Sequence, residues 1–411
     1  MIKKIIIIIC FLLTAFVNAQ NETANWFFGE KAGLNFNNGF ASANLDGELV
    51  TTEGCSTISN RQGDLLFYSD GITVWNKNHE IMQNGTGLAG DDSSTQSAII
   101  IPDTGSNSVY YIFTVDSRAG PDGLRYSRVD MNLDAGLGAV TTAKNVLLVT
   151  PTTEKITAVE SSDGESIWVI SHKWESNEFV AYLVSASGVN PVPVVSAVGS
   201  VHGGDLNNSI GYLKASPDRE KIASVKSFTN NETQIFDFNA ATGEITNPIT
   251  ISNYISEDIG PYGCEFSPDS KLLYVSEIIR DAPVAFSKIH QYDLTLNTQQ
   301  QILDSDIIVG QEEGLLGAIQ QALDGKIYIA KFNSSQISII KKPNDLGLDC
   351  AYGAEAVNLG SRISRLGLPP FIQSYFFATN IFENTCFGDT TSFNIETSST
   401  IDSILSGFWR P

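Results

Sequence analysis

One pattern recurs six times along this 411-residue sequence: a tight turn followed by an aromatic, β-branched segment. The turns end at Gly63, Gly105, Gly164, Arg219, Ser270 and Gly325, so successive copies lie 42 to 59 residues apart. The segments after or near them are 64–69, 108–114, 165–171, 220–226, 271–277 and 326–331. Such residues favour strands, and helical periodicity is nearly absent. A repeat of roughly 40–50 residues is typical of four-stranded β-propeller blades.

Each copy holds two more expected strands. The strands before the turns are 54–59, 95–102, 156–161, 211–217, 262–268 and 317–323, and their small residues suit innermost strands. The third strands are 72–76, 124–131, 178–185, 233–239, 288–294 and 336–342. The chain ends supply another unit, with 367–377 as its innermost strand and 25–30 and 32–37 as its second and third.

We therefore predict an all-β, seven-bladed propeller over residues 25–378. One C-terminal strand and about three N-terminal strands share the closing blade, and closure removes open sheet edges. The alternative is a two-sheet sandwich in which the periodicity is accidental.

The first residues have the character of a secretory signal peptide. Lys3 and Lys4 precede the apolar run 5–17, and Val17-Asn18-Ala19 provides small residues for cleavage. The run is shorter than the roughly 20 residues that span a bilayer. We expect residues 1–19 to be removed and the mature chain to be exported.

The charge balance restricts the partners. The chain has 25 basic and 46 acidic residues, a formal net charge of −21. An acidic surface repels nucleic-acid phosphates and anionic lipid headgroups, so we expect neither nucleic-acid binding nor membrane insertion. No loop has calcium-binding spacing, so calcium is unsupported and we expect no cofactor. A monomer is expected.

The cysteines of the mature chain match no zinc pattern. Cys55 and Cys264 each follow a glycine at the start of a strand, which favours buried free thiols. Cys350 and Cys386 form a candidate disulfide, which export would permit.

Several stretches resemble a known family: residues 25–39 (NWFFGEKAGLNFNNG), 53–88, 93–102, 110–116, 123–132, 154–159 and 367–377. They are similar to the N-terminal propeller of large surface proteins exported by the bacterial type IX secretion system. In that family PKD-like immunoglobulin-type modules follow, and a type B, gliding-motility-associated sorting domain ends the chain. The resemblance implies a cell-surface location and adhesion or polymer binding, and it provides no catalytic residues.

Residues 384–411 resemble the first strands of a PKD-like module. Such a sandwich needs about 100 residues, so this tail is expected to be a truncated, disordered start. Residues 407–411 (GFWRP) depart from the family in a way that a frameshift would produce. The family's sorting domain would then be missing, and a product truncated at 411 is expected in the periplasm.

Catalytic signatures are missing from the sequence. The four histidines, His79, His172, His202 and His290, have no metal-ligand spacing, and no GxSxG elbow occurs. Propeller ligands are expected where inner-strand ends meet the central channel. The weak candidates for ligand binding are Glu53, Trp75, Gln96, Lys155, His172, Trp174, Glu265 and Gln320. The two tryptophans could stack on sugar rings or simply pack between strands.

The sequence alone favours an exported surface module that recognises a polysaccharide or a surface protein, with no catalysis of its own. The alternatives are a channel-mouth enzyme, such as a lactonase, lyase or glycosidase, and an inert structural spacer. An enzyme would require titratable groups with perturbed pKa values to converge at the channel mouth.

Overall fold

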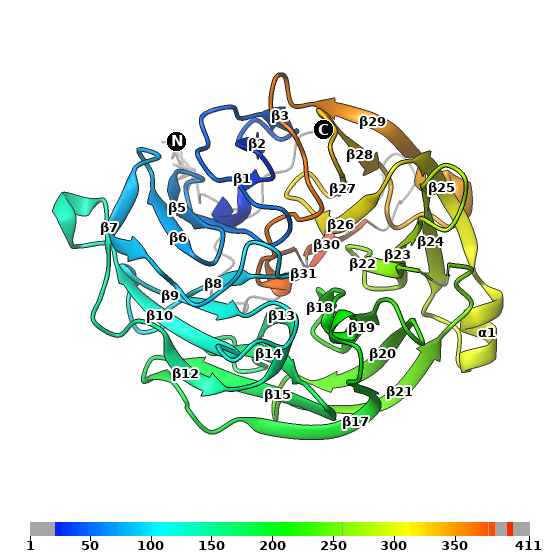
Figure 1. Cartoon of the computed structure of the whole chain (residues 1–411), viewed down its shortest axis with the longest axis horizontal. Helices are drawn as coiled ribbons and strands as arrows, with labels where there is room; N and C mark the ends of the chain where they lie inside the picture. Colours follow the sequence, from blue (N-terminus) through cyan, green and yellow to red (C-terminus); the bar gives the residue numbers. More distant parts are fainter. Residues whose placement is uncertain (1–20, 257, 377, 383–392, 398–411) are drawn as a thin grey trace, which may run out of the picture.

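Successive small sheets are arranged around a common centre, as Figure 1 shows. The computed structural model describes residues 21–256, 258–376, 378–382 and 393–397. The predicted signal peptide lies outside these residues, and so does most of the predicted PKD-like tail. Within them, no helix has the length and apolar character needed to cross a membrane.

The described chain is dominated by strands, and its helices are short. The helices are η1 (Asn21–Thr23), η2 (Asp134–Gly136), η3 (Leu206–Ser209), α1 (Gln299–Asp304), η4 (Gly347–Cys350) and η5 (Gln373–Phe376). The all-β prediction is therefore confirmed, and the ring of sheets is propeller-like.

The first two predicted blades join into one nine-stranded sheet, because β7 pairs in parallel with β11. Its first part is β4 (Ser56–Ser59), β5 (Leu65–Ser69), β6 (Thr73–Asn76) and β7 (Ile81–Thr86). Its second part is β8 (Ala98–Pro102), β9 (Val109–Val115), β10 (Leu124–Asp130), β11 (Ala139–Val140) and β12 (Val146–Val149).

Four antiparallel sheets continue the ring. The first comprises β13 (Thr152–Glu160), β14 (Ile167–Lys173), β15 (Ser176–Ser185), β16 (Gly188–Val189) and β17 (Val194–His202). The second comprises β18 (Leu213–Ala215), β19 (Lys221–Lys226), β20 (Glu232–Asn239) and β21 (Glu244–Ile251), and the third comprises β22 (Gly260–Phe266), β23 (Leu272–Ile279), β24 (Phe286–Asp293) and β25 (Ile307–Glu313). The fourth comprises β26 (Leu316–Gln321), β27 (Ile327–Lys331), β28 (Gln336–Ile340) and β29 (Tyr352–Asn358). All six predicted inner strands are present, as β4, β8, β13, β18, β22 and β26.

Burial decreases from the centre outward. Every residue of the inner strands β22 and β26 is buried, whereas the outermost strands β21, β25 and β29 alternate or are largely exposed. A strand covered on both faces buries continuous apolar residues, and a rim strand needs only one apolar face. The small residues of the predicted inner strands therefore reflect crowding at the centre.

The closing segment differs from the prediction. Among the described residues, the N-terminal sheet contains β1 (Asn25–Phe28), β2 (Ala32–Asn35) and β3 (Ser42–Ala43), and no C-terminal strand joins it. The expected innermost strand at 367–377 has no strand over its described residues. Its end forms η5 instead, near the centre of the ring. Pro369 and Pro370 carry no N–H and cannot donate ladder bonds, and the segment forms only an isolated bridge, between Ile372 and Ala158 of β13, over its described residues.

Individual backbone contacts close the ring instead. Glu30 forms an isolated bridge with Ile363. The Leu366 N–H donates to the Thr52 carbonyl, and its own carbonyl accepts from the Ala318 N–H, which lies in β26. The C-terminal segment thus lies between the first and the last complete sheets.

Two further observations concern the C-terminus and the thiols. Strand β30 (Ala378–Phe382) pairs with β31 (Phe393–Thr397), so part of the predicted tail is a strand. Cys55 and Cys264 are buried free thiols, as predicted. Cys350 is also buried, whereas Cys386 lies outside the described residues.

Candidate functional site

Five titratable residues gather at the end of the ring where the inner strands begin. Glu53 lies just before β4, and Glu154 and Lys155 lie in the first half of β13. His172 lies near the end of β14, which is antiparallel to β13 with Thr152 opposite Lys173. His202 ends β17 opposite Ser176. We call these five residues the mouth cluster, because antiparallel pairing brings them to one end of the ring.

Glu53 is held by close backbone contacts. A Cβ at Gly367 would lie 1.6 Å from the Glu53 carbonyl oxygen, and one at Gly54 would lie 2.1 Å from the Ser97 amide. Burial raises the pKa of Glu53 well above its usual value, and the Glu154 carboxylate raises it further. The Tyr262 hydroxyl faces Glu53 and lowers its pKa, yet no hydrogen bond of good geometry reaches Glu53 Oε2. Burial therefore favours the protonated form of Glu53, and Oε2 has no well-formed hydrogen bond in the described structure.

Glu154 has a different environment. Its Oε2 accepts from the Thr95 amide at 2.9 Å and from the Thr95 hydroxyl at 2.7 Å. Its Oε1 accepts from the Arg118 amide at 2.7 Å and from the Ser209 hydroxyl at 3.3 Å. Burial raises its pKa, and these hydrogen bonds oppose that rise. Its oxygens are occupied by these hydrogen bonds, and its proximity raises the pKa of both Glu53 and Lys155.

Lys155 is fully buried, and its amine is fixed by two carbonyl groups. Nζ donates to the Ser209 carbonyl at 2.8 Å and to the Ile210 carbonyl at 3.0 Å. Burial lowers its pKa to about 7, although the Glu154 carboxylate acts in the opposite direction. A neutral amine has two N–H groups and one lone pair. The two carbonyls use both N–H groups, so the lone pair of the neutral form stays free to accept a proton.

His172 and His202 form a buried pair whose ring centroids are 4.2 Å apart. His172 Nδ1 lies 2.8 Å from the Lys173 carbonyl oxygen, which can only accept, so Nδ1 carries the proton and Nε2 keeps its lone pair. Burial lowers the pKa of His172 to about 3 and that of His202 well below its usual value, and Lys155 lowers both further. Both rings are therefore neutral.

A second group lies on the inner strands β18, β22 and β26. Lys214 Nζ donates to Glu265 Oε2 at 2.9 Å and to Gln320 Oε1 at 2.5 Å. The Lys214 and Glu265 side chains are 1% and 0% exposed. We call these three residues the central triad. Glu265 also accepts from the Phe266 and Gln321 amides, so the triad is a buried polar link between three neighbouring sheets.

The other predicted candidates have different surroundings. Gln96 exchanges hydrogen bonds with the Leu213 backbone through Nε2 at 3.1 Å and Oε1 at 2.8 Å, which joins β8 to β18. Trp75 lies on β6 and stacks on Tyr68. Trp174 is buried in the turn between β14 and β15.

The fold thus brings three of the candidates predicted from the sequence, Glu53, Lys155 and His172, into the mouth cluster. Two others, Glu265 and Gln320, belong to the central triad. It missed Glu154, His202 and Lys214. Glu154 adjoins Lys155, and Lys214 has the position in its repeat that Glu265 has in the next, so both had a signal in the repeat alignment. His202 had none, because it ends β17 (Val194–His202), which is not among the predicted strands.

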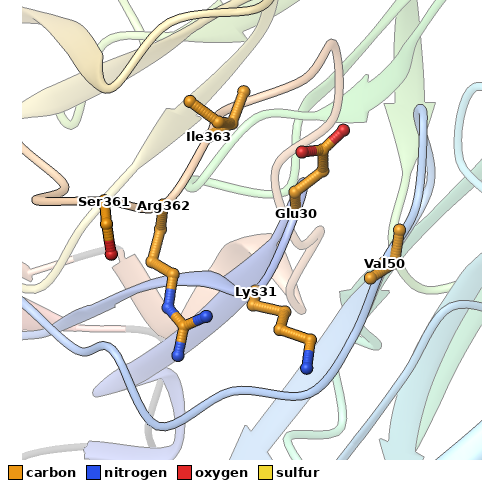
Figure 2. Close-up of a pocket in the computed structure, with 6 residues that line it drawn as sticks. All are labelled: Glu30, Lys31, Val50, Ser361, Arg362 and Ile363. Carbon is orange, nitrogen blue, oxygen red and sulfur yellow. The ribbon is translucent and has the colours of Figure 1, made fainter.

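The hollow drawn in Figure 2 lies elsewhere, at the seam where the ring closes. It is lined by Glu30, Lys31, Val50, Ser361, Arg362 and Ile363. Two of its charges already have partners, since Glu30 pairs with Arg365 and Lys31 with Glu48. None of the mouth-cluster residues lines this hollow. The mouth cluster is therefore chosen as the candidate site because its titratable groups lie close together and have shifted pKa values, and not because it lines a hollow. Over the described ranges, no three His, Cys, Asp or Glu residues gather as a metal-binding group.

No protein-family description and no curated protein matches this sequence. Several solved structures have a backbone fold similar to that of this chain. Virginiamycin B lyase from Staphylococcus aureus is 13% identical, with 76% of this chain and 84% of that chain covered and a TM-score of 0.42. A luciferin-regenerating enzyme is 11% identical, with 86% and 97% covered and a TM-score of 0.39. A candidate 6-phosphogluconolactonase from Bacteroides uniformis is 13% identical, with 76% and 98% covered and a TM-score of 0.41.

The prediction of a binding module without catalysis is contradicted by this comparison, in which the three structures named above are described as enzymes. The reasoning erred in treating missing sequence motifs as missing chemistry. Groups that meet only through the fold leave no local motif. At these identities no activity of the matched proteins is carried over to this chain.

Proposed function

We propose that this chain is an enzyme that works by general acid–base catalysis at the mouth cluster, as a lyase acting on a carboxylate-bearing substrate. One observation carries the proposal: the Lys155 amine, with a pKa of about 7, has both N–H groups of its neutral form committed and its lone pair free. A base whose pKa lies near the working pH is the most effective general base.

The acid in this proposal is Glu53. Burial raises its pKa well above the usual value, which favours the protonated form, and the Tyr262 hydroxyl is the polar side chain that faces it. Glu154 lies beside Lys155 and also raises the pKa of Glu53, which places both working groups around one carboxylate. Environments that move the pKa values of neighbouring groups in opposite directions are the usual basis of acid and base roles.

The reaction is an elimination. The Lys155 lone pair takes the proton from the carbon next to the substrate carboxylate, and the C–H electron pair forms a C=C bond. The bond from the next carbon to its oxygen substituent breaks, and the Glu53 proton passes to that oxygen. The Lys155 ammonium then returns a proton to Glu53 through solvent. Lys226, at the same end of β19, pairs with Glu232 and lowers the pKa of His172 through its positive charge.

The test is an elimination assay on acidic oligosaccharides and β-alkoxy carboxylic acids, which reads the ultraviolet absorbance of the new double bond. Lys155→Met and Glu53→Gln should each lower kcat by about 10²–10⁴-fold, the usual contribution of one acid or base. The matched control is Lys271→Met, since the Lys271 side chain is 64% exposed and follows the turn at the opposite end of its inner strand. Rates should rise as pH increases through the Lys155 pKa of about 7.

Two outcomes of this assay would contradict the lyase proposal. If no substrate yields an unsaturated product, or if Lys155→Met retains full activity, the lyase proposal fails. Hydrolysis without a new double bond would favour a lactonase or glycosidase. Circular dichroism of each variant shows whether a loss reflects chemistry or unfolding.

We also propose that the ring has seven blades, with β1–β3 and the 363–372 segment as the closing unit. The Glu30–Ile363 bridge and the two Leu366 hydrogen bonds support this count. Export, and kinship with type IX secreted surface proteins, are proposed from the sequence alone. Mass spectrometry of the mature N-terminus would test cleavage after Ala19.

A further inference from the structure

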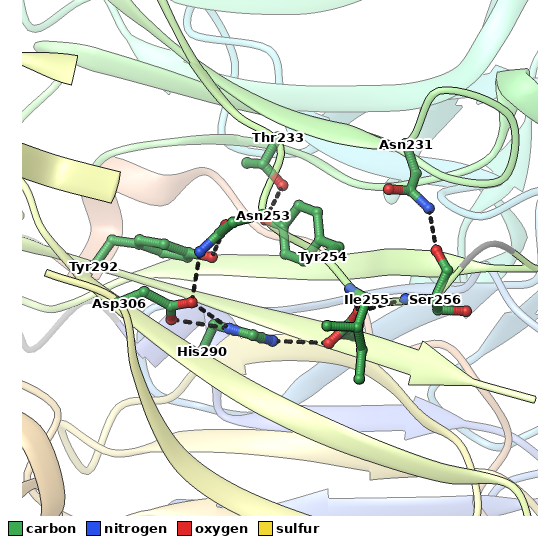
Figure 3. Close-up of polar contacts among 10 residues, drawn as sticks. Asn231, Thr233, Asn253, Tyr254, Ile255, Ser256, His290, Tyr292 and Asp306 are labelled. Atoms are coloured by element: carbon green, nitrogen blue, oxygen red, sulfur yellow. Dashed lines mark hydrogen bonds and ion pairs between the residues drawn. The ribbon is translucent and has the colours of Figure 1, made fainter. Parts of the chain in front are cut away.

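His290, in β24, has a carboxylate at each ring nitrogen. Figure 3 shows His290 beside Asp306 and the 253–256 segment. Nδ1 lies 2.9 Å from Asp306 Oδ1, and Nε2 lies 3.1 Å from Glu277 Oε2. The His290 side chain is 4% exposed and the Glu277 side chain 0%. Asp306 comes from the residue before β25, and Glu277 comes from β23, so three neighbouring segments meet at this ring.

This geometry fixes the protonation of the ring. A carboxylate only accepts hydrogen bonds, and a neutral imidazole has only one N–H to donate. Both contacts are attractive only when both nitrogens carry protons. The charged imidazolium then makes two charge-assisted hydrogen bonds, which are the strong kind.

The same two carboxylates hold a loop, the 253–256 segment between β21 and β22. Glu277 Oε1 accepts from the Ile255 amide at 2.5 Å and from the Ser256 amide at 3.0 Å. Asp306 Oδ2 accepts from Asn253 Nδ2 at 2.7 Å. The loop is therefore tied to His290 at both ends through one carboxylate each (Figure 3).

We infer that the Asp306–His290–Glu277 chain is a proton-controlled clamp, which holds the 253–256 segment while His290 is charged and loosens it when His290 loses a proton. The other groups facing the ring are the phenols of Tyr254, edge-on at 5.5 Å between centroids, and Tyr292, stacked at 6.1 Å. Neither is charged near neutral pH, since burial raises the pKa of both.

The direction of the pH effect follows from the two carboxylates. Burial lowers the pKa of His290, but its bonds to Asp306 and Glu277 outweigh burial and raise that pKa above its usual value. The clamp is therefore fully present below the unfolded pKa of about 6.5 and is lost as pH rises through the folded pKa. The segment leads into β22, which carries Tyr262 beside Glu53. The inference shares no residue with the proposed acid–base pair and stands apart from it.

Hydrogen exchange of the 253–256 backbone amides, read against pH and corrected for the intrinsic exchange rate, tests the clamp. Protection in the wild type should fall about tenfold or more as pH rises through the His290 pKa, which corresponds to one lost charge-assisted bond. His290→Gln should show low protection that no longer depends on pH. Asp258→Asn is the matched control, because it breaks the nearby exposed pair with Arg280 and leaves the clamp intact.

Nitrogen NMR of the His290 ring gives a second measurement that does not need a variant. Both ring nitrogens should be protonated at acidic pH. Asp306→Asn, which keeps the histidine and removes one charge, should lower the titration midpoint even if His290→Gln does not fold. A neutral His290 ring at acidic pH, or wild-type protection with the same pH profile as His290→Gln, would overturn the inference.

Discussion

The buried pair of His172 and His202 should make the protein sensitive to mild acid. Both side chains are at most 2% exposed, and neither His172 Nε2 nor either nitrogen of His202 has a well-formed hydrogen bond in the described structure. The unfolded chain binds a proton at each histidine below about pH 6.5, whereas the folded chain binds none there. Stability is therefore complete above the unfolded pKa and falls as pH decreases toward the folded value, which is about 3 for His172.

The size of the effect follows from proton linkage. Each pH unit between the two pKa values costs about 1.4 kcal/mol per histidine, so at pH 5 each site lowers the free energy of unfolding by about 2 kcal/mol. The pair together should account for a loss of about 4 kcal/mol between roughly pH 7.5 and 5. The charged His290 acts in the opposite direction above about pH 6.5, and its contribution cancels when the wild type is compared with a variant that keeps His290.

Urea denaturation at both pH values measures this loss. The double variant His172→Asn/His202→Asn cannot titrate, and its loss between the two pH values should be smaller than the wild-type loss by about 4 kcal/mol. Contributions of carboxylates cancel in this comparison. The control is His79→Asn, a partly exposed turn residue, for which the difference should be much smaller. Equal losses in the wild type and the double variant would refute the reasoning from burial.

Two other predictions concern the centre of the ring. Lys214→Met leaves the Glu265 carboxylate buried and unpaired, so urea denaturation should show a loss of about 3–5 kcal/mol, and Lys214→Met/Glu265→Leu should recover most of it. A loss in the single variant below about 1 kcal/mol would contradict this account of the triad. Burial raises the pKa of the Cys55 and Cys264 thiols, so a thiol reagent should modify them only after denaturation. Rapid labelling of either thiol in the native protein would show that the inner strands open.

The strands were predictable because each copy of the repeat has the same types of residue at its turn and in its strands. Turn residues and β-branched or aromatic runs occur at regular intervals, and the six inner strands predicted from the repeat are present, whereas the seventh, at 367–377, is not present over its described residues. Residues 367–377 were predicted to be a strand because they are largely apolar, although the segment contains Pro369 and Pro370. Those prolines lack the donors that a strand requires, so a stricter reading could have excluded it.

The candidate site was only partly predictable. Glu53, Lys155 and His172 could be singled out as polar residues on or near inner strands. Their roles could not, because a pKa depends on burial and on neighbours that are distant in sequence. Lys155 and Ser209 are such a pair: the contact exists only because β13 and η3 meet in the ring.

The sequence by itself determined an all-β repeat with acidic charge, buried thiols and strands in a fixed order, since these depend on local composition and spacing. The tertiary structure decided which polar groups are dehydrated, which are saturated by hydrogen bonds and which keep a free proton or lone pair. Glu53 and Glu154 are the same residue type, yet one has an uncommitted oxygen and the other accepts four hydrogen bonds. The physical reason is that chemistry depends on the solvation of each group, and only the packed ring determines which groups lose water.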